Sequence, residues 1–268
     1  MNNRETVYRY ETHIHTFPES ACAMSEGREY IRAYLEAGYT GLIITNHFYR
    51  GNSGINRHLN WKEWVKQFCR GYEKTYEEGL KQGLDIFFGW EETLDDGDDY
   101  LIYGLDKEWL LNHPECRYWS RFDQYHETHA AGGCVVQAHP FREAYYLDQI
   151  TLSPFLVDAV EVLNGGNLPS ANAYAYRYAQ KIAKPMTAGT DMHNARGFHA
   201  QNSCGIYMKQ KMKTISDYVH ALRAGTVQII PPPSQQIMSD SAALSTPVFV
   251  ITEEGNVVPE YQSPIAVD

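Results

Sequence analysis

The sequence of 268 residues predicts an α/β protein built as a β/α barrel. Short apolar runs alternate with helical patterns along most of the chain, which is typical of βα units and a parallel sheet. About seven such units fit within roughly 230 residues, and this number suits a barrel better than an open sheet. The composition, 43% hydrophobic and 21% charged, is that of a chain with a sizeable buried core.

The first half of the chain shows the alternation clearly. A strand ends at two histidines, and a helix then opens at Ser25, with Ile31, Tyr34 and Leu35 at helical spacing, and ends at Gly38. A second, longer helix has a stripe of tryptophan, phenylalanine and tyrosine. We expect strands over 7–14, 41–45, 85–90 and 100–105, and helices over 25–38 and 59–83.

The second half repeats the pattern and then stops. We expect helices over 120–131, 169–183 and 214–224, and strands over 134–138, 157–163, 185–188 and 227–230. The prolines from Pro231 onward cannot continue either structure, so 231–236 is predicted to be a linker. A hairpin turning at Glu254, Gly255 and Asn256 should follow. The predicted organisation is one barrel domain over 1–232 and a short C-terminal tail over 233–268.

Composition also limits the partners and the compartment. Lys and Arg total 23 against 33 Asp and Glu, a net charge of −10, which speaks against a nucleic-acid partner. No apolar run reaches the ~20 residues of a membrane span, and the N-terminus has no leader pattern, so we expect no membrane association. Five cysteines without a C-x-x-C pair fit a reducing, cytoplasmic environment.

Two short motifs place metal-binding side chains at strand ends. His13 and His15 are two residues apart, so their imidazoles face the same side of a strand and can share one metal ion. Asp191 and His193 repeat this spacing after the strand expected over 185–188, and a carboxylate with an imidazole suits Zn, Fe or Mn.

Three more expected strands end in a ligand-type residue. These residues are His47, Glu91 and His139. In a β/α barrel the C-terminal strand ends open on one face, so residues far apart in sequence converge there. One such residue is weak evidence, but five strand ends with the same feature are hard to attribute to chance and predict a metal site on this face.

With these motifs the chain resembles the PHP (polymerase and histidinol phosphatase) domain family over roughly its first 230 residues. The matching segments occur in family order and are ETHIHT, IITNH, FFGWEET, DDYLIYGL, VVQAHPFR and AGTDMHN. The resemblance implies a distorted (β/α)7 barrel, PHP- or TIM-like, with two or three divalent Zn, Fe or Mn ions. It also implies a phosphatase that hydrolyses a small phosphate monoester, such as histidinol phosphate, with a metal-bound hydroxide at a di- or trinuclear site.

The resemblance assigns roles to single residues. Asp191 would join His13 and His15 on one metal, and Glu91 would bridge two metals. His139 would serve the second metal. His47 and His193 would bind the third, and Asp99 lies where many members have a further histidine. Of these residues we expect Glu91, Asp191 and His193 to carry the catalysis.

The chain departs from the family pattern at three places. Asn46 replaces an aspartate that would orient a ligand, and Asp99 replaces a histidine, which favours a harder metal. After the H-x-H pair some members add a third-metal ligand about six residues on. Here Cys22 or Glu19 could take that role.

Two arginines are candidates for substrate binding. Arg142 follows His139 by three residues, and its planar guanidinium suits a phosphate. Arg196, close after His193, is the second candidate, and for both a surface salt bridge is the alternative. Glu161 could orient a ligand at another strand end, but we favour a structural role for it.

Two other functions fit parts of the pattern. An amidohydrolase-type metal hydrolase also begins with H-x-H on a barrel strand, but such enzymes typically add a strand-end lysine, and this chain places Glu91 there. A non-catalytic metal-binding domain should have lost ligands in several motifs, whereas the set here is nearly complete.

Overall fold

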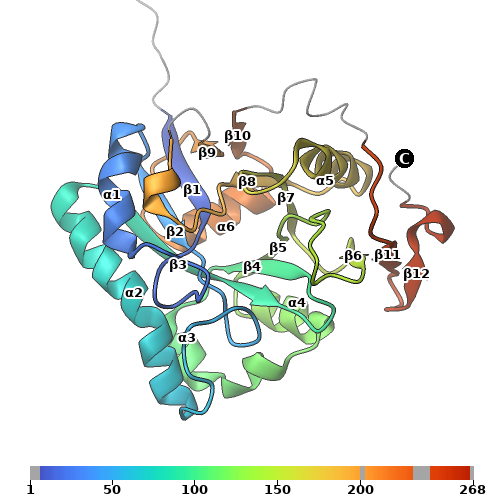
Figure 1. Ribbon diagram of the computed structural model, residues 1–268, viewed down its shortest axis with the longest axis horizontal. Coiled ribbons are helices and arrows are strands. Elements are labelled where there is room, and N and C mark those ends of the chain that lie inside the picture. The colour runs from blue at the N-terminus through green and yellow to red at the C-terminus, as the bar shows by residue number, and fades with distance from the viewer. Residues whose placement is uncertain (1–6, 200–202, 232–241, 266–268) are drawn as a thin grey trace, which may run out of the picture.

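The computed structural model describes residues 7–199, 203–231 and 242–265 (Figure 1). The helices are α1 (Gly27–Glu36), α2 (Trp61–Gln82), α3 (Lys107–Asn112), α4 (Arg121–Ala130), α5 (Pro169–Lys181) and α6 (Ile215–Arg223), with 3-10 turns η1 (Pro114–Tyr118), η2 (Ala195–Gly197) and η4 (Glu260–Gln262). The strands are β1 (Tyr8–Ile14), β2 (Gly41–Ile44), β3 (Asp85–Thr93), β4 (Asp99–Tyr103), β5 (Cys134–Gln137), β6 (Ile150–Leu152), β7 (Ala159–Asn164), β8 (Met186–Gly189), β9 (Gly205–Met208), β10 (Gln228–Ile230), β11 (Val248–Ile251) and β12 (Val257–Pro259).

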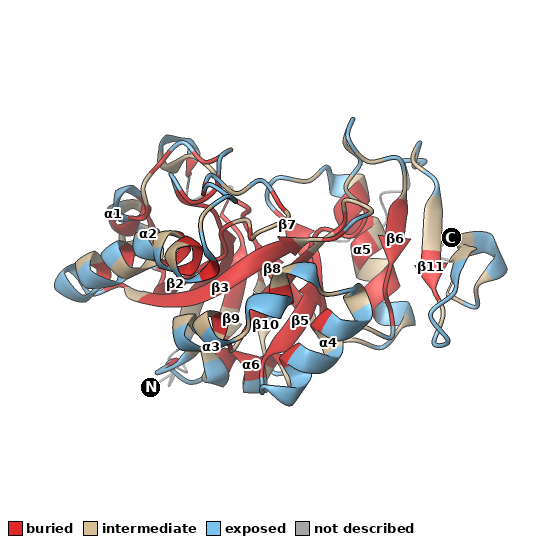
Figure 2. Cartoon of the chain, turned by 90° about the horizontal axis from the view of Figure 1, so that it is seen from below, coloured by how far each residue is buried: buried red, intermediate tan, exposed pale blue. Residues whose placement is uncertain are grey.

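Nine strands form one barrel-like sheet in the order β10-β9-β1-β2-β3-β4-β5-β7-β8. The two ends of this sheet meet beside β1, where the Thr12 hydroxyl donates to the carbonyl of Ala188 at 2.8 Å and Ile14 forms a parallel bridge with Met192. The predicted α/β barrel is therefore confirmed. Most residues of the barrel strands β1 to β5, β7 and β8 are buried, and the helices expose their outer faces (Figure 2).

The expected strand over 100–105 runs in the opposite direction to a regular β/α barrel. β4 pairs antiparallel with both β3 and β5. The reason is the short connection after β3, because a parallel crossover needs a dozen or more residues and a hairpin does not. Gly97 has φ +87° in this turn, a conformation that favours glycine. As a result, Asp99 at the start of β4 lies at the same end of the barrel as Glu91.

Other elements were not anticipated from the sequence. The strand β9 is antiparallel to β1 and to β10, and the short helix α3 follows β4. The helix expected over 59–83 is present as α2, where the Asn60 side chain accepts from the backbone N–H of Glu63 at 3.1 Å and Gly83 ends the helix with φ +86°.

The C-terminal segment packs on the side of the barrel rather than apart from it (Figure 1). β11 and β12 are antiparallel, with a turn at 252–256 that includes the predicted Gly255. β11 also pairs in parallel with β6, so the tail completes a second, three-stranded sheet. The predicted linker over 231–236 lies outside the described residues except for Pro231. Within the described part of the chain, no helix is long and apolar enough to cross a bilayer.

Candidate metal centre

The predicted ligands gather at one end of the barrel. Three groups each have ligand atoms within 4.8 Å of one another, and they are His13, Glu91 and His139; His13, His15 and Asp191; and His15, His47 and His193. Asp99 is adjacent, with Oδ2 3.9 Å from Nε2 of His139. The structure therefore brings together residues from six regions of the sequence, the first at His13 and the last at His193.

The H-x-H pair faces inward from the end of β1. The two Nε2 atoms of His13 and His15 lie 3.2 Å apart, and both side chains are fully buried. Gly189 on β8 makes this approach possible, because a Cβ there would lie 2.4 Å from Cβ of His13. Burial, followed by the positive charge of His47, lowers the pKa of His15 to about 3, so this imidazole is neutral and can act as a ligand.

Asp191 is held against the H-x-H pair by the backbone. Its N–H donates to the carbonyl of His13 at 2.8 Å, and the N–H of His15 donates to the carbonyl of Met192 at 3.0 Å. Asp191 Oδ1 then lies 3.1 Å from Nε2 of His15 and 3.4 Å from Nε2 of His13. The residue adopts φ +54°, and such positive values in residues other than glycine are costly and tend to occur at functional sites.

Glu91 occupies the middle of the cluster. Its Oε1 lies 3.2 Å from Nε2 of His13 and 3.0 Å from Nε2 of His139, while Oε2 lies 2.8 Å from Nδ1 of His47. Burial raises the pKa of this carboxyl, but the charges of His47 and His13 outweigh burial and hold it well below its ordinary value. An ionised carboxylate with one oxygen toward each side is suited to bridge two cations.

His139 is the second candidate ligand with an unusual backbone. It has φ +28°, and among the described residues only Ala183 and Asp191 share a positive φ without being glycine. Its N–H donates to Oε2 of Glu161 at 3.0 Å, which holds the turn in place.

The outer part of the cluster is more open to solvent. The side chains of His47 and His193 are 14% and 31% exposed, and Cys22 is half-buried beside them. Burial raises the pKa of the Cys22 thiol, but hydrogen bonds with His193 and His47 lower it overall to about 6. Cys22 therefore lies at the side of the two outer histidines.

Glu19, the alternative to Cys22, is placed elsewhere. Its side chain is buried against Gly71 of α2, where a Cβ on that glycine would lie 2.1 Å from Glu19 Oε2. Asn46, which replaces the family's aspartate, accepts hydrogen bonds from the N–H of Thr16 and the hydroxyl of Ser20. Ser20 in turn contacts Nδ1 of His15 at 3.1 Å, so Asn46 reaches this histidine through a serine.

The two candidate arginines differ in position. Nη2 of Arg142 donates to Oδ2 of Asp191 at 2.6 Å and to Oδ1 of Asn164 at 3.1 Å, and Nε donates to Oδ1 of Asn167 at 2.9 Å. Arg196 is exposed on η2, and no hydrogen bond or ion pair joins its side chain to the site residues that the structure describes. The structure brings Arg142 to the centre and leaves Arg196 at the surface.

Glu161 has a closer link to the centre than the sequence indicated. Its Oε1 lies 2.9 Å from Nδ1 of His13, and Oε2 accepts from the backbone of His139 and from Asn164 Nδ2 at 2.9 Å. These contacts favour the ligand-orienting role over the structural role that we preferred from the sequence, because a carboxylate at this position can orient the imidazole that faces the candidate metal site. The signal in the sequence was an acidic residue within the apolar strand β7.

Glu11 is a second supporting carboxylate that the sequence did not reveal. Its Oε1 accepts from the N–H groups of His13 and Thr190, both at 2.9 Å, and Oε2 accepts from the Tyr34 hydroxyl at 3.0 Å. Burial raises the pKa of Glu11 to about 7. Through these hydrogen bonds Glu11 links the end of β1 to the residue that follows β8. In the sequence, its position within the ETHIHT segment was the one indication of such a role.

The chemistry of the donor set fits divalent metal ions. Four carboxylates that are at most 11% exposed lie in or beside the cluster, and they are Glu91, Asp99, Glu161 and Asp191. Among the described residues Arg142 is the permanent cation in contact with them, so the rest of this buried negative charge has to be compensated by protonated imidazoles or by bound cations. Nδ1 of His47 and Oε2 of Glu91 are close, yet neither has a hydrogen bond of acceptable geometry among the described residues. Imidazole nitrogens and carboxylate oxygens that converge in this way are the ligands that Zn, Fe and Mn prefer.

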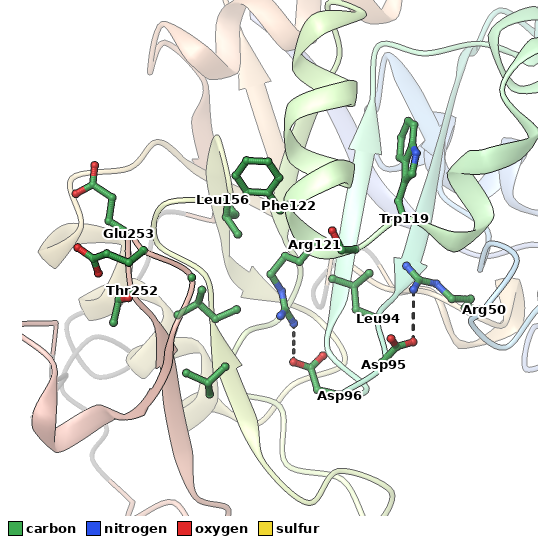
Figure 3. A pocket seen from close by; sticks show the side chains of 15 residues that line it. Arg50, Leu94, Asp95, Asp96, Trp119, Arg121, Phe122, Leu156, Thr252 and Glu253 are labelled. Atoms are coloured by element: carbon green, nitrogen blue, oxygen red, sulfur yellow. Dashed lines mark hydrogen bonds and ion pairs between the residues drawn. The ribbon is translucent and has the colours of Figure 1, made fainter.

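A separate cavity of about 420 Å³ lies where the β11–β12 turn faces the β3–β4 turn and the start of α4 (Figure 3). Arg121 pairs with Asp96 there, and Arg50 pairs with Asp95. None of the candidate ligands lines this cavity. This cavity is therefore separate from the candidate metal centre.

The fold and the residue cluster together define a PHP-like barrel with a group of side chains able to hold metal ions. No family model matches the sequence, and no curated protein does either. Solved structures do match. A two-domain protein from Bacteroides vulgatus that contains a predicted PHP-like metal-dependent phosphoesterase is 15% identical, with a TM-score of 0.56 over 84% of this chain and 64% of that one.

Two further solved structures share the fold. One is an amidohydrolase from Chromobacterium violaceum, 13% identical, with a TM-score of 0.51 over 85% of this chain and 99% of that one. The other is Endonuclease Q, solved with a duplex carrying an abasic lesion, 10% identical, with a TM-score of 0.51 over 82% of this chain and 57% of that one. At these identities the comparisons show the fold, and they confirm the PHP-like barrel that the motifs predicted. The chain spans less than two thirds of the length of the Bacteroides protein.

Proposed function

We propose that this chain is a metal-dependent hydrolase that cleaves phosphate monoesters of small molecules. The observation that carries the proposal is the convergence of four buried side chains, with Arg142 directly beside them. They are His13, Glu91, His139 and Asp191, and within each candidate ligand group the ligand atoms lie within 4.8 Å of one another. Two or three divalent ions held there would lower the pKa of a bound water and neutralise charge on a phosphate.

The protein side chains have distinct parts in this proposal. Glu91 offers one oxygen to each side of the cluster, and Asp191 offers Oδ1 to the H-x-H pair while Arg142 holds its Oδ2. Nδ1 of His193 lies 2.7 Å from the backbone carbonyl of Asp191, so it can donate its proton there and leave Nε2 free as a ligand. Nη1 of Arg142 has no hydrogen-bond partner within the described chain, and this nitrogen is the one we assign to a phosphate oxygen.

The class of substrate follows from charge and position. A net charge of −10 disfavours a long nucleic-acid backbone, although one structural relative acts on DNA. Bound cations would reverse the local field, so a small phosphate remains compatible with the acidic chain. We also propose a reducing, cytoplasmic setting, since all five cysteines are free.

An amidohydrolase is the second candidate because one structural relative has that description. The centre of this chain has Glu91 rather than a lysine at the end of β3, which favours the phosphoesterase. A non-catalytic metal-binding domain would keep the ions without turnover.

The decisive experiment combines elemental analysis with a substrate panel. Protein purified without chelator should contain two to three transition-metal ions per chain and hydrolyse an aryl phosphate and small phosphate monoesters. The panel should include phosphodiesters, an abasic DNA duplex and amide substrates, so that each alternative gives its own positive result. One ion or none would contradict the multinuclear centre, and metal without any turnover would leave the non-catalytic domain as the better description.

A further inference from the structure

The segment between β5 and β6 carries two residues of the centre. His139 and Arg142 lie just after β5, and the chain then crosses an exposed stretch to Ile150. The N–H of Arg142 donates to the carbonyl of His139 at 2.9 Å, so the two residues form one turn. Whatever fixes this turn also fixes the guanidinium that contacts Asp191.

The stretch after Arg142 has few anchors of its own. Tyr145 and Tyr146 are exposed, and Glu143 is exposed as well. One anchor is Leu147, whose Cδ2 lies against Gly97 in the β3–β4 turn. Loops with little buried apolar surface open easily unless other groups hold them.

The C-terminal segment supplies the missing anchors. Oε1 of Glu143 accepts from the N–H and the hydroxyl of Ser245, both at 2.6 Å, and from the N–H of Thr246 at 2.7 Å. Hydrogen bonds to an ionised carboxylate are among the stronger ones in proteins.

The same segment also holds the two flanks of the loop. The N–H of Ile150 donates to the carbonyl of Pro247 at 2.9 Å, where β6 begins to pair with β11. Phe141 is 1% exposed and belongs to the same apolar cluster as Val250 of β11. The tail therefore acts on the residues immediately before and after Arg142.

We propose that the C-terminal segment 242–265 is a positioning element of the metal centre, which acts through Glu143 and Phe141 on Arg142. Arg142 in turn holds Oδ2 of Asp191, so that Oδ1 faces the H-x-H pair. The inference rests on the proposed function in one respect, because it treats the cluster as a metal site. Glu143 touches none of the reacting groups and is a positioning residue.

The first test measures the loop directly and requires no activity. Hydrogen exchange of the amides over 140–152 should be at least about tenfold faster in Glu143→Ala than in the unchanged protein, because Glu143 accepts three hydrogen bonds and the loss of a single ordinary one already corresponds to about that factor. Glu253→Ala removes an exposed glutamate from the turn of the same tail and serves as the matched control. Equal exchange over 140–152 in Glu143→Ala and the control would overturn the proposal.

The second test measures metal binding. In competition with a chelator, Glu143→Ala should bind Mn²⁺ or Zn²⁺ about tenfold more weakly, at the lower end of the loss seen when a group that orients a ligand is removed. Saturating metal should restore turnover of an aryl phosphate, a rescue that general unfolding would not allow. Unchanged metal affinity would show that the tail holds the loop without acting on the centre.

A double-mutant cycle tests the route. If Glu143 acts through Arg142, the metal affinity of Arg142→Lys should fall little further when Glu143→Ala is added, whereas independent routes would give additive losses and overturn the proposal. If Glu143→Ala does not fold, Ser245→Ala removes only the hydroxyl donor and should shift exchange and metal affinity in the same direction by a smaller factor.

These outcomes separate the two proposals. A protein that binds no metal and cleaves no substrate would contradict the proposed function, while the exchange experiment would still decide whether the tail holds the loop. A protein that binds metal and turns over, with Glu143→Ala equal to the control, would contradict the positioning role alone.

Discussion

The two halves of the candidate metal centre differ in burial although they use the same kinds of side chain. The inner half consists of His13, Glu91, His139 and Asp191, and none of these side chains is more than 4% exposed. The outer half consists of His47, His193 and Cys22, which are partly exposed. His15 lies between the halves.

The supporting contacts differ in the same way. In the inner half, Glu161 holds His13 and the backbone of His139, and Arg142 holds Asp191. In the outer half, His193 contacts a backbone carbonyl, and His47 contacts Glu91. Because orienting partners raise metal affinity, the inner half should hold its ions firmly and the outer half should exchange its ion with solvent.

The largest loss of metal affinity and turnover is expected for Asp191, a candidate ligand of the inner half. Asp191→Asn replaces a charged ligand oxygen by a neutral amide, so metal affinity and hydrolysis of an aryl phosphate should fall by more than about 100-fold, beyond the upper end for orienting partners. Elemental analysis and initial rates measure both. Asp95→Asn, at a side chain that is 95% exposed, is the control and should behave like the unchanged protein. Turnover retained in Asp191→Asn would remove the inner half from the mechanism.

The next effect should come from a residue behind the ligands. Glu161→Gln keeps the shape of the side chain but removes the charge beside Nδ1 of His13, so metal affinity should fall about 10- to 100-fold. Chelator competition measures this affinity, and saturating metal should recover most of the turnover. If the affinity is unchanged, burial alone rather than an orienting carboxylate distinguishes the inner half.

The sequence predicted the fold and the convergence of the candidate ligands because both follow from local patterns. Period-two spacing places His13 and His15 on one side of a strand, and the convergence of strand ends in a barrel then brings Glu91 and Asp191 to them. Neither step requires knowledge of loop geometry. The prediction of a parallel sheet failed at β4, because the direction of this strand depends on the turn before it. The short connection that contains Gly97 makes β4 antiparallel to β3.

The supporting residues could not be predicted in the same way. Glu161 lies on a buried strand, and whether an isolated acidic residue there orients a ligand or ties down a loop depends on a neighbour 148 positions away. The separation of Cys22 from Glu19 depends on the path of one loop, which turns Glu19 toward Gly71 of α2. Short-range patterns carry no information on either choice.

A smaller effect is expected in the outer half. The Cys22 thiol has a pKa lowered to about 6, and in Cys22→Ser a hydroxyl that stays neutral takes its place. The outer ion should therefore bind more weakly in this variant, while the inner ions remain. Metal content should fall by about one ion per chain after mild chelation, and turnover should fall by about tenfold or less. Cys22→His keeps a ligand and should retain that ion. Equal metal content in the serine variant would show that Cys22 is not a ligand.

The smallest effect on metal binding is expected for a substitution of Glu19. This substitution tests whether Glu19 belongs to the outer half. Burial raises the pKa of Glu19 from 4.5 to about 7. Below about pH 4.5 this carboxyl is protonated in both the folded and the unfolded chain, so it costs no stability there. As the pH rises toward 7, only the unfolded chain ionises, and stability is lost.

Glu19→Gln stays neutral at every pH. The variant should therefore match the unchanged protein well below pH 4.5 and be more stable at pH 8, by at most about 3.4 kcal/mol for a shift of this size, with a Tm higher by several degrees. Glu127→Gln, at an exposed position on α4, is the control. Metal content should not change in Glu19→Gln. If the metal content falls, Glu19 binds an ion in solution. The outer half would then include a carboxylate that the structure places against α2 instead.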